Sequence, residues 1–187
     1  MFKTQALNAR IYSIVLRLAA SKGWGGVTLQ AVAKEVKIPL ATFRKRFASE
    51  NEIIPLIIEE ITHQARKDAG RIKGSRRDVL FEYLMARFDI LQQHRKAIAS
   101  IADAARHDHA LACVLARAVM ESMAQIADVA KLNVPRAIAA AGLSVIYGFT
   151  FLAWRKDKSR DMAKTMAALD KGLRLSEKAA AIIKQNF

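Results

Sequence analysis

The sequence predicts an all-α protein with a small N-terminal three-helix domain and a larger helical domain behind it. Ala, Leu, Ile, Lys and Arg dominate the 187 residues, and there are only three prolines, which is the usage of a helical protein. Apolar residues recur at intervals of three and four, the period of helices that bury one face. We place the small domain at residues 1–50 and the larger one at residues 51–187.

The first helix is predicted at about residues 5–22, where apolar residues follow the helical period. A glycine-rich stretch ends it, and Trp24 and Val27 are the expected anchors into a small core. Thr28 is placed to be an N-cap, because its hydroxyl can accept from the unpaired backbone amides of the next helix. That second helix is expected to run to about Glu35.

The stretch from Val27 to Phe47 predicts two short helices joined by a turn at Lys37–Ile38. Pro39 suits the start of the third helix, where a missing N–H costs nothing. The outer face of this helix carries small and basic side chains and its inner face is apolar, as in the helix of a helix-turn-helix that enters the DNA major groove. The candidate DNA-binding residues are Thr28, Lys37, Pro39, Leu40, Ala41, Thr42, Arg44, Lys45 and Arg46.

The net charge of +14 indicates a polyanionic partner, either nucleic acid or an anionic membrane surface. Residues 1–50 contain nine Lys or Arg and two acids. Half of the net charge therefore lies in about a quarter of the chain, which favours a local electrostatic footprint.

Two motifs, T-L-x-x-V-A-x-E-x-x-I from Thr28 and A-T-F-x-x-x-F-x-S from Ala41, resemble the DNA-binding domain of TetR-family transcriptional regulators. The resemblance covers about residues 6–58. It implies a homodimer that binds double-stranded DNA at a palindromic operator, with a helical ligand-binding and dimerisation domain behind the DNA-binding domain.

Three positions depart from this family's pattern. Lys37 stands where the turn usually has glycine, so a residue with a Cβ is expected in a left-handed conformation, at a cost of about 1 kcal/mol. Arg44 replaces a tyrosine that touches phosphate in the family. Glu50 replaces a lysine that commonly opens the fourth helix, which removes one phosphate contact.

The fourth helix has two possible starts. Ser49 and Glu52 fit a capping box, but Pro55 then removes a backbone hydrogen bond. Either the helix begins late or it bends at Pro55. Residues 66–77, with six basic residues and two glycines, are predicted to be a linker.

The larger domain is expected to contain helices at about 77–93, 96–106, 108–131, 135–154 and 161–185. Residues 137–154 have no formal charge and are long enough to raise the question of a membrane span. Their Ala, Gly, Ser, Tyr and Thr content favours instead a helix buried by its own domain on one side and by a second subunit on the other. The predicted dimer interface is Leu143, Ile146, Met162, Met166, Leu169 and Leu173.

Aromatic and methionine side chains of the larger domain are either plain core or the lining of an effector pocket. The candidate lining residues are Phe81, Met85, Phe88, Met120, Met123, Tyr147 and Phe151. Few buried charges are expected there, so the effector is predicted to be a small apolar or weakly polar molecule.

The sequence contains no catalytic motif of the hydrolase, phosphate-loop or zinc-protease kind, and we expect neither an enzyme nor a cofactor. His107 and His109, near Asp103 and Asp108, lack metal-site spacing, so a solvated corner is expected and no metal. Cys113 is predicted to be a small buried residue. With no signal peptide or transmembrane segment expected, the protein is predicted to be cytoplasmic.

Two functions from different classes follow. The first is a ligand-responsive transcriptional regulator, a repressor. The second is a lipid-binding protein at a membrane surface, because Thr165–Arg174 resembles a TetR-fold protein of ubiquinone biosynthesis and a basic surface suits anionic lipid. The basic outer face of the third helix favours the transcriptional regulator over the lipid-binding protein.

Overall fold

The computed structural model describes residues 2–68 and 74–185, and these residues form helices and their connections without any strand. The predicted all-α fold is confirmed. The chain divides into two compact units, one of Met1–Gln64 with Asp89–Val119 and one of Ala65–Phe88 with Met120–Phe187. Each unit is described by itself below.

The first unit contains the predicted N-terminal helices together with helices from further along the chain. It consists of α1 (Phe2–Lys22), a 3-10 turn at Trp24–Gly26, α2 (Leu29–Val36), α3 (Leu40–Arg44), a 3-10 turn at Glu50–Ile53, most of α4 (Ile54–Asp68), α6 (Arg95–Ala105) and the start of α7 (His109–Val129). Trp24 and Val27 are buried as predicted, and so is the predicted inner face of α2, made of Leu29, Val32, Ala33 and Val36.

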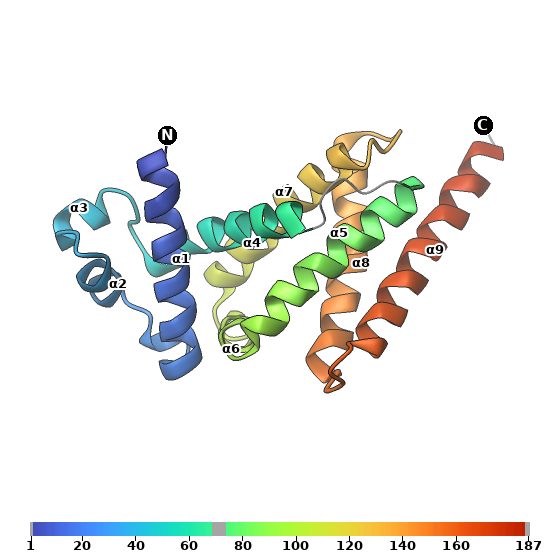
Figure 1. The fold of residues 1–187 in the computed structure, drawn as a ribbon. Helices are drawn as coiled ribbons and strands as arrows, with labels where there is room; N and C mark the ends of the chain where they lie inside the picture. Colours follow the sequence, from blue (N-terminus) through green and yellow to red (C-terminus); the bar gives the residue numbers. More distant parts are fainter. Residues whose placement is uncertain (1, 69–73, 186–187) are drawn as a thin grey trace. The chain divides into compact units, whose positions relative to one another are not determined.

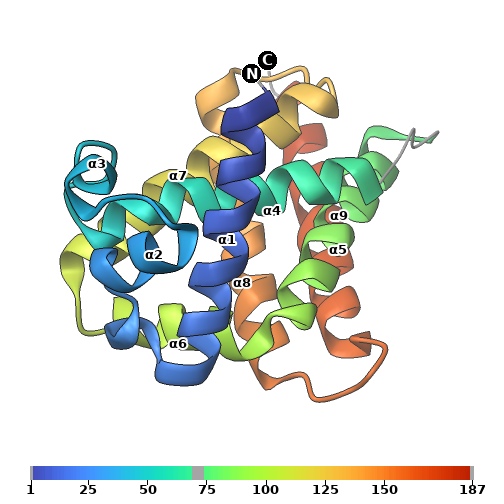
Figure 2. The ribbon, with the colours of Figure 1, turned by 60° about the vertical axis from the view of Figure 1, so that its left-hand side comes forward.

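Helix α6 packs against α1 and the first 3-10 turn, at the end of α1 that is lower in Figure 2. The Ser100 hydroxyl of α6 accepts a hydrogen bond from the Trp24 amide at 2.6 Å. The Tyr12 ring of α1 meets the ring of His94, at the start of α6, edge-on with 5.7 Å between centroids. These contacts extend the first unit well beyond residue 50, where the sequence placed the domain boundary.

The structure shows where α3 ends and how α4 begins. Helix α3 has only five residues, although helical hydrogen bonding continues to the Phe47 amide, which bonds Phe43 O at 3.0 Å. The Ser49 side chain makes no cap bond, whereas Glu52 accepts from the Ala48 amide at 2.7 Å. A 3-10 turn precedes α4, so Pro55 lies in the first turn of the helix, where its missing N–H is not needed. The late start is confirmed.

The second unit contains most of α5 (Arg76–Gln93), the rest of α7, α8 (Arg136–Lys156) and α9 (Ala163–Gln185). The predicted linker at 66–77 is shorter than expected, because residues 66–68 end α4 and residues 76–77 begin α5. Its middle, residues 69–73, lies outside the described residues.

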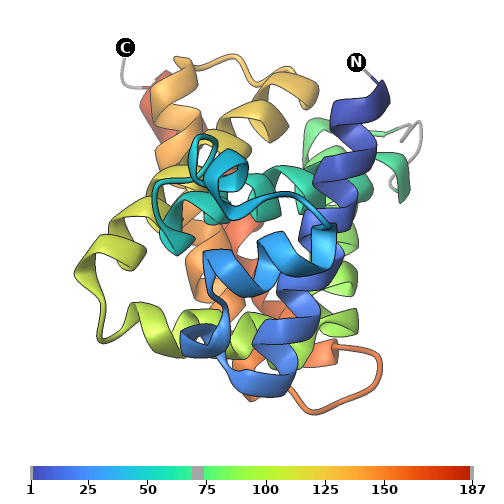
Figure 3. The ribbon, with the colours of Figure 1, turned by 90° about the vertical axis from the view of Figure 1, so that its left-hand side faces the viewer.

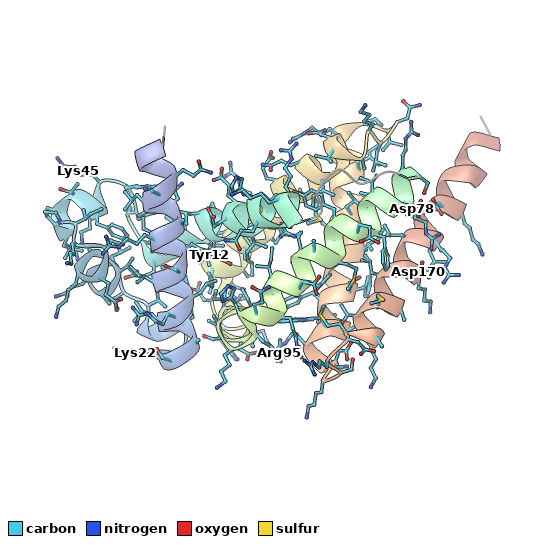
Figure 4. All side chains as sticks on the ribbon, viewed as in Figure 1. Tyr12, Lys22, Lys45, Asp78, Arg95 and Asp170 are labelled. Atoms are coloured by element: carbon cyan, nitrogen blue, oxygen red, sulfur yellow. The ribbon has the colours of Figure 1, made fainter. Side chains whose placement is uncertain are left out.

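Helices α8 and α9 run side by side in this unit (Figure 1). Gly172 permits their close approach, because a Cβ there would lie 2.8 Å from Cγ2 of Ile146. Asp170 of α9 (Figure 4) forms an ion pair with Arg77 of α5. The unit is therefore held by side chains from its first and last helices as well as by its apolar core.

The Asp157 carboxylate organises the connection between α8 and α9. It is buried and accepts hydrogen bonds from the Ser159 hydroxyl at 2.5 Å and from the Thr165 amide and hydroxyl, each at 2.9 Å. The Ser159 hydroxyl and the Thr165 groups hold the pKa of Asp157 well below its usual range, against the opposing effect of burial.

Two predictions about α7 and α8 can be compared with the structure. Cys113 of α7 is exposed, so its predicted burial is wrong. By length and composition alone, α7 and α8 could each cross a membrane, a test that core helices of soluble proteins also pass.

Candidate nucleic-acid interface

Helices α2 and α3 lie on one side of α1 (Figure 1), and Figure 3 turns this side toward the viewer. Phe43 and Phe47 anchor α3 to the unit, with ring centroids 5.0 Å apart and both side chains buried. Apart from the half-buried Leu40, the remaining residues of α3 and the two that follow it are exposed.

Two side chains cap the N-terminus of α2. The Thr28 hydroxyl accepts from the Ala31 amide at 3.1 Å, so the predicted N-cap is confirmed. Glu50 lies 21 residues after Leu29 in the chain, and its Oε1 accepts a hydrogen bond from the Leu29 amide at 3.0 Å. A carboxylate at a helix N-terminus also interacts favourably with the helix dipole. Glu50 thus stabilises α2, a role that the sequence analysis missed.

The turn between α2 and α3 is built on a left-handed Lys37, with φ 59° and ψ 43°. The Lys37 amide bonds Lys34 O at 3.2 Å and the Ile38 amide bonds Ala33 O at 3.0 Å, which is the Schellman pattern that ends a helix. The predicted left-handed conformation at this non-glycine position is confirmed.

The nine candidate DNA-binding residues gather on this side of the unit, and all but one are exposed. The exception is Leu40, which is half-buried at the start of α3; the exposed ones are Thr28, Lys37, Pro39, Ala41, Thr42, Arg44, Lys45 and Arg46. The arrangement presents small side chains near the start of α3 and cations at its end, as a groove-reading helix requires.

The three cations at the end of α3 differ in what they contact. Arg46 donates to Asn8 Oδ1 of α1 at 2.6 Å, and its guanidinium lies 5.0 Å from the centre of the Phe47 ring. Arg46 therefore braces α3 against α1. Within the described residues Arg44 and Lys45 form no side-chain hydrogen bond or ion pair, and Lys45 lies at the outer edge of the unit (Figure 4). Both side chains are exposed to solvent.

No family model and no curated protein matches the sequence, but solved structures do. A TetR transcriptional regulator from Nitrosomonas europaea ATCC 19718 superposes with a TM-score of 0.70 at 20% identity, over 90% of this chain and 96% of that one. One from Rhodococcus sp. RHA1 gives 0.70 at 16% identity, over 92% and 96%. The chain has the TetR fold. A third match is Thermus thermophilus FadR, a TetR-family transcriptional repressor solved with lauroyl-CoA, with a TM-score of 0.58 at 15% identity over 90% and 92%.

In this TetR fold the predicted pocket residues lie in the second unit but differ in burial. Met85, Phe88, Met123 and Tyr147 are buried, Phe81 and Phe151 are half-buried, and Met120 is exposed. The Phe88 and Tyr147 rings pack together with centroids 5.2 Å apart, and Phe151 packs on Trp154 at the same distance.

A charged side chain that was not predicted from the sequence lies next to these residues. Arg87 is fully buried, directly before Phe88. Helical periodicity alone could have placed it on the inner face of α5, but an arginine is almost never fully buried unless it is paired.

Most residues of the predicted dimer interface are buried within the chain itself. Leu143, Met162, Leu169 and Leu173 are buried, and Ile146 packs on Gly172. Only Met166, of those predicted, is exposed. The exposed apolar residues of α8 instead share another face, formed by Ile138, Val145, Phe149 and Leu152, and this set is called the α8 face below.

The corner that contains His107 and His109 has a structural role. Asp108 accepts from the Leu111 amide at 3.0 Å and so caps α7, and it also accepts from the Asn51 amide group at 3.4 Å. Both interactions lower the pKa of Asp108, that with Leu111 more. Among the described residues there is no group of three or more His, Cys, Asp or Glu placed to hold a metal ion.

Proposed function

We propose that this chain is a cytoplasmic TetR-family regulator, a ligand-responsive repressor that binds a palindromic DNA operator as a homodimer. The observation that carries the proposal is the outer side of α3, where Thr42, Arg44 and Lys45 are exposed on a helix anchored by two buried phenylalanines. Such a surface suits the major groove.

Arg44 and Lys45 supply phosphate contacts in this proposal, and Ala41 and Thr42 approach the bases. Phosphate contacts position the protein on the duplex, whereas contacts to base edges specify the sequence. Lys37, at the start of the turn, adds a further exposed cation on the same side.

The α8 face supports a homodimer. Its members Ile138, Val145, Phe149 and Leu152 are 64%, 59%, 70% and 55% exposed. With Gly142 they recur at spacings of four and three, which is the seam of helices that pack at a shallow angle. Beyond their own helix backbone and chain neighbours, no atom of the described residues lies within 4 Å of where a Cβ on Gly142 or Gly148 would be. A dimer would present two copies of α3 about 34 Å apart, one turn of B-DNA.

In this proposal the effector binds in the second unit, among the buried aromatic and methionine side chains of α5, α7 and α8. The FadR with the same fold was solved with lauroyl-CoA, which shows that an acyl compound can bind that protein. In this chain, effector binding would favour one of two conformations that differ in affinity for DNA.

Selection of bound duplexes from a random pool, repeated over a salt series, tests the proposal. We expect a palindromic consensus and a steep fall of affinity with salt. Lys45→Ala should weaken binding to all sequences and lower the salt slope by about one unit. Arg46→Ala should mainly lower stability, because Arg46 bonds Asn8.

The proposal fails if no duplex is enriched and binding does not depend on salt. Lipid that co-purifies with such a protein would favour the lipid-binding alternative. A salt slope unchanged by Lys45→Ala would show that this lysine does not face the phosphates.

A further inference from the structure

Helix α3 is too short to fix its own orientation. It has five residues, little more than one helical turn. Its anchors are the half-buried Leu40 and the buried Phe43, followed by the buried Phe47 just after the helix. These side chains are spaced by three and four residues, so they lie along one stripe. Rotation of α3 about that stripe must therefore be fixed by a contact on its flank.

Arg46 supplies a contact on the flank of this stripe. Its Nη2 donates to Oδ1 of Asn8, a half-buried residue of α1, at 2.6 Å. Its Cζ lies 5.0 Å from the centre of the Phe47 ring. The guanidinium therefore links a buried anchor of α3 to a different helix of the same unit.

Helix α1 also holds the end of α2. Nη2 of Arg10 donates to the backbone oxygen of Glu35 at 3.1 Å, and Arg17 forms an ion pair with the Glu35 carboxylate. Glu35 lies in the last turn of α2, where backbone carbonyls lack partners within the helix and a cation interacts favourably with the helix dipole. Side chains of α1 thus contact both helices of the helix-turn-helix.

We infer that Asn8 and Arg46 set the orientation of α3 on DNA and so determine how well the protein discriminates between sequences. The inference rests on the proposed DNA-binding function, in which Ala41 and Thr42 approach the bases. Hydrogen bonds to base edges require a defined direction, whereas the flexible stem of Lys45 can follow a phosphate. A change in the tilt of α3 therefore weakens base contacts more than phosphate contacts.

Three roles of the Arg46 side chain lead to different results. A phosphate ligand contributes to the binding of every duplex and to the salt slope. A residue that only stabilises the fold changes neither the salt slope nor the relative affinity for two duplexes while the protein stays folded. A positioning residue lowers the affinity for the operator more than the affinity for other DNA. The ratio of the two affinities and the salt slope together separate these roles.

The test compares the wild-type chain with Asn8→Ala, which removes the acceptor and leaves every charge in place. Each protein is titrated with the operator duplex from the random-pool selection and with a shuffled duplex of the same composition, over a salt series. We expect the ratio of the two affinities to fall about tenfold, the size of one lost base contact. The salt slope on the shuffled duplex should keep its wild-type value. An unchanged ratio overturns the inference.

Further variants assign the effect to this pair. Arg46→Met should reproduce the loss, and the double variant should lose no more than either single change, because both act through one contact. Asn8→Asp should keep the ratio, because a carboxylate also accepts from a guanidinium. If the losses from Asn8→Ala and Arg46→Met add in full, the two side chains do not act through one contact and the inference is overturned.

Two control variants complete this series. Lys45→Met changes the neighbouring cation and should lower the salt slope by about one unit while the ratio stays the same. Asn133→Ala makes the same change as Asn8→Ala at an exposed asparagine between α7 and α8, and it should alter neither quantity. A slope that falls with Arg46→Met while the ratio holds would make Arg46 a phosphate ligand and overturn the inference.

Amide hydrogen exchange on the free chain tests the role of Asn8 without DNA. The Phe43 amide bonds Pro39 O and the Phe47 amide bonds Phe43 O, each at 3.0 Å. We expect both amides to exchange faster in Asn8→Ala, while the Val32 amide of α2 keeps its rate. Equal acceleration of all three amides would mark a global loss of stability, and no acceleration would mean that Asn8 does not hold α3. Either result overturns the inference.

The outcomes distinguish this inference from the proposed function. A wild-type chain that enriches no operator refutes the proposed regulator, and the inference falls with it. A wild-type chain that discriminates between the duplexes, together with an Asn8→Ala chain that discriminates equally well, refutes the inference alone.

Discussion

Glu50 Oε1 accepts a hydrogen bond from the Leu29 amide at 3.0 Å. The two residues lie 21 positions apart, so the 3-10 turn before α4 holds the start of α2. TetR-family regulators commonly have a lysine at the position of Glu50, and the sequence therefore suggested a lost phosphate contact. The structure shows what the acid does instead, because it pairs an amide that the first turn of a helix leaves free.

Restoring the family lysine should therefore cost stability. We expect Glu50→Lys to lower the free energy of unfolding by about 1–2 kcal/mol, since it removes the cap and places a cation at the positive end of α2. Urea denaturation measures the change. Glu59→Lys makes the same change of charge on an exposed part of α4 and should be close to neutral; equal losses in both variants would argue against the cap.

Relief of the strained turn should have the opposite effect. Lys37 is left-handed, and glycine adopts this conformation without steric cost, so Lys37→Gly should stabilise the chain by about 0.5–1 kcal/mol. Lys34→Gly, inside α2, should destabilise it by about 1 kcal/mol. Chemical denaturation of the two variants side by side gives the comparison, and a loss of stability with Lys37→Gly would contradict the strain.

Asp157 should make the stability of the second unit depend on pH. Its pKa is lower in the folded chain than in the unfolded one, so its contribution is full above the unfolded value of about 4 and is lost as the pH falls below it. Asp157→Asn should cost about 1–3 kcal/mol at neutral pH, because it weakens buried hydrogen bonds.

Denaturation over a pH series tests this linkage. The gap between wild type and Asp157→Asn should narrow as the pH falls below about 4. Glu82→Gln changes an exposed acid of α5 in the same unit and should show no such gap at any pH. A gap that stays constant through the acid range would mean that the pKa of Asp157 is the same in the folded and the unfolded chain.

The α8 face should control the oligomeric state. Phe149 is 70% exposed, and Phe149→Glu would place a charge in the proposed seam, where it would be buried without a partner. We expect sedimentation to report a monomer that folds normally but loses tight operator binding. Gln125→Glu adds the same charge to an exposed position of α7 and should leave the assembly unchanged; a Phe149→Glu protein that sediments like wild type would exclude this face.

The helix-turn-helix segment was predictable because its determinants are local. The Thr28 hydroxyl reaches an amide three residues away, and the backbone of Lys37 closes its turn with Ala33 and Lys34. The inner face of α2 follows from a period of 3.6 residues. Interactions of this range can be inferred from residue order.

Other features depended on residues that only the fold brings together. Arg46 bonds Asn8 from 38 residues away, and the Ser100 hydroxyl meets the Trp24 amide across 76. Residue order alone could not reveal either pairing. The first gives Arg46 a partner on α1 within the chain, and the second joins α6 to the first 3-10 turn.

The sequence by itself determined the helical class, the ends of α2 and the exposure of the basic residues at the end of α3. Each of these depends on periodicity or on a few neighbouring residues. The sequence could not determine which side of α8 is free, since that helix is apolar on most of its circumference. In the folded chain Leu143 is buried, whereas Phe149 is exposed. The tertiary structure also decided that Arg87 is buried, because three helices must converge before a cation can be enclosed.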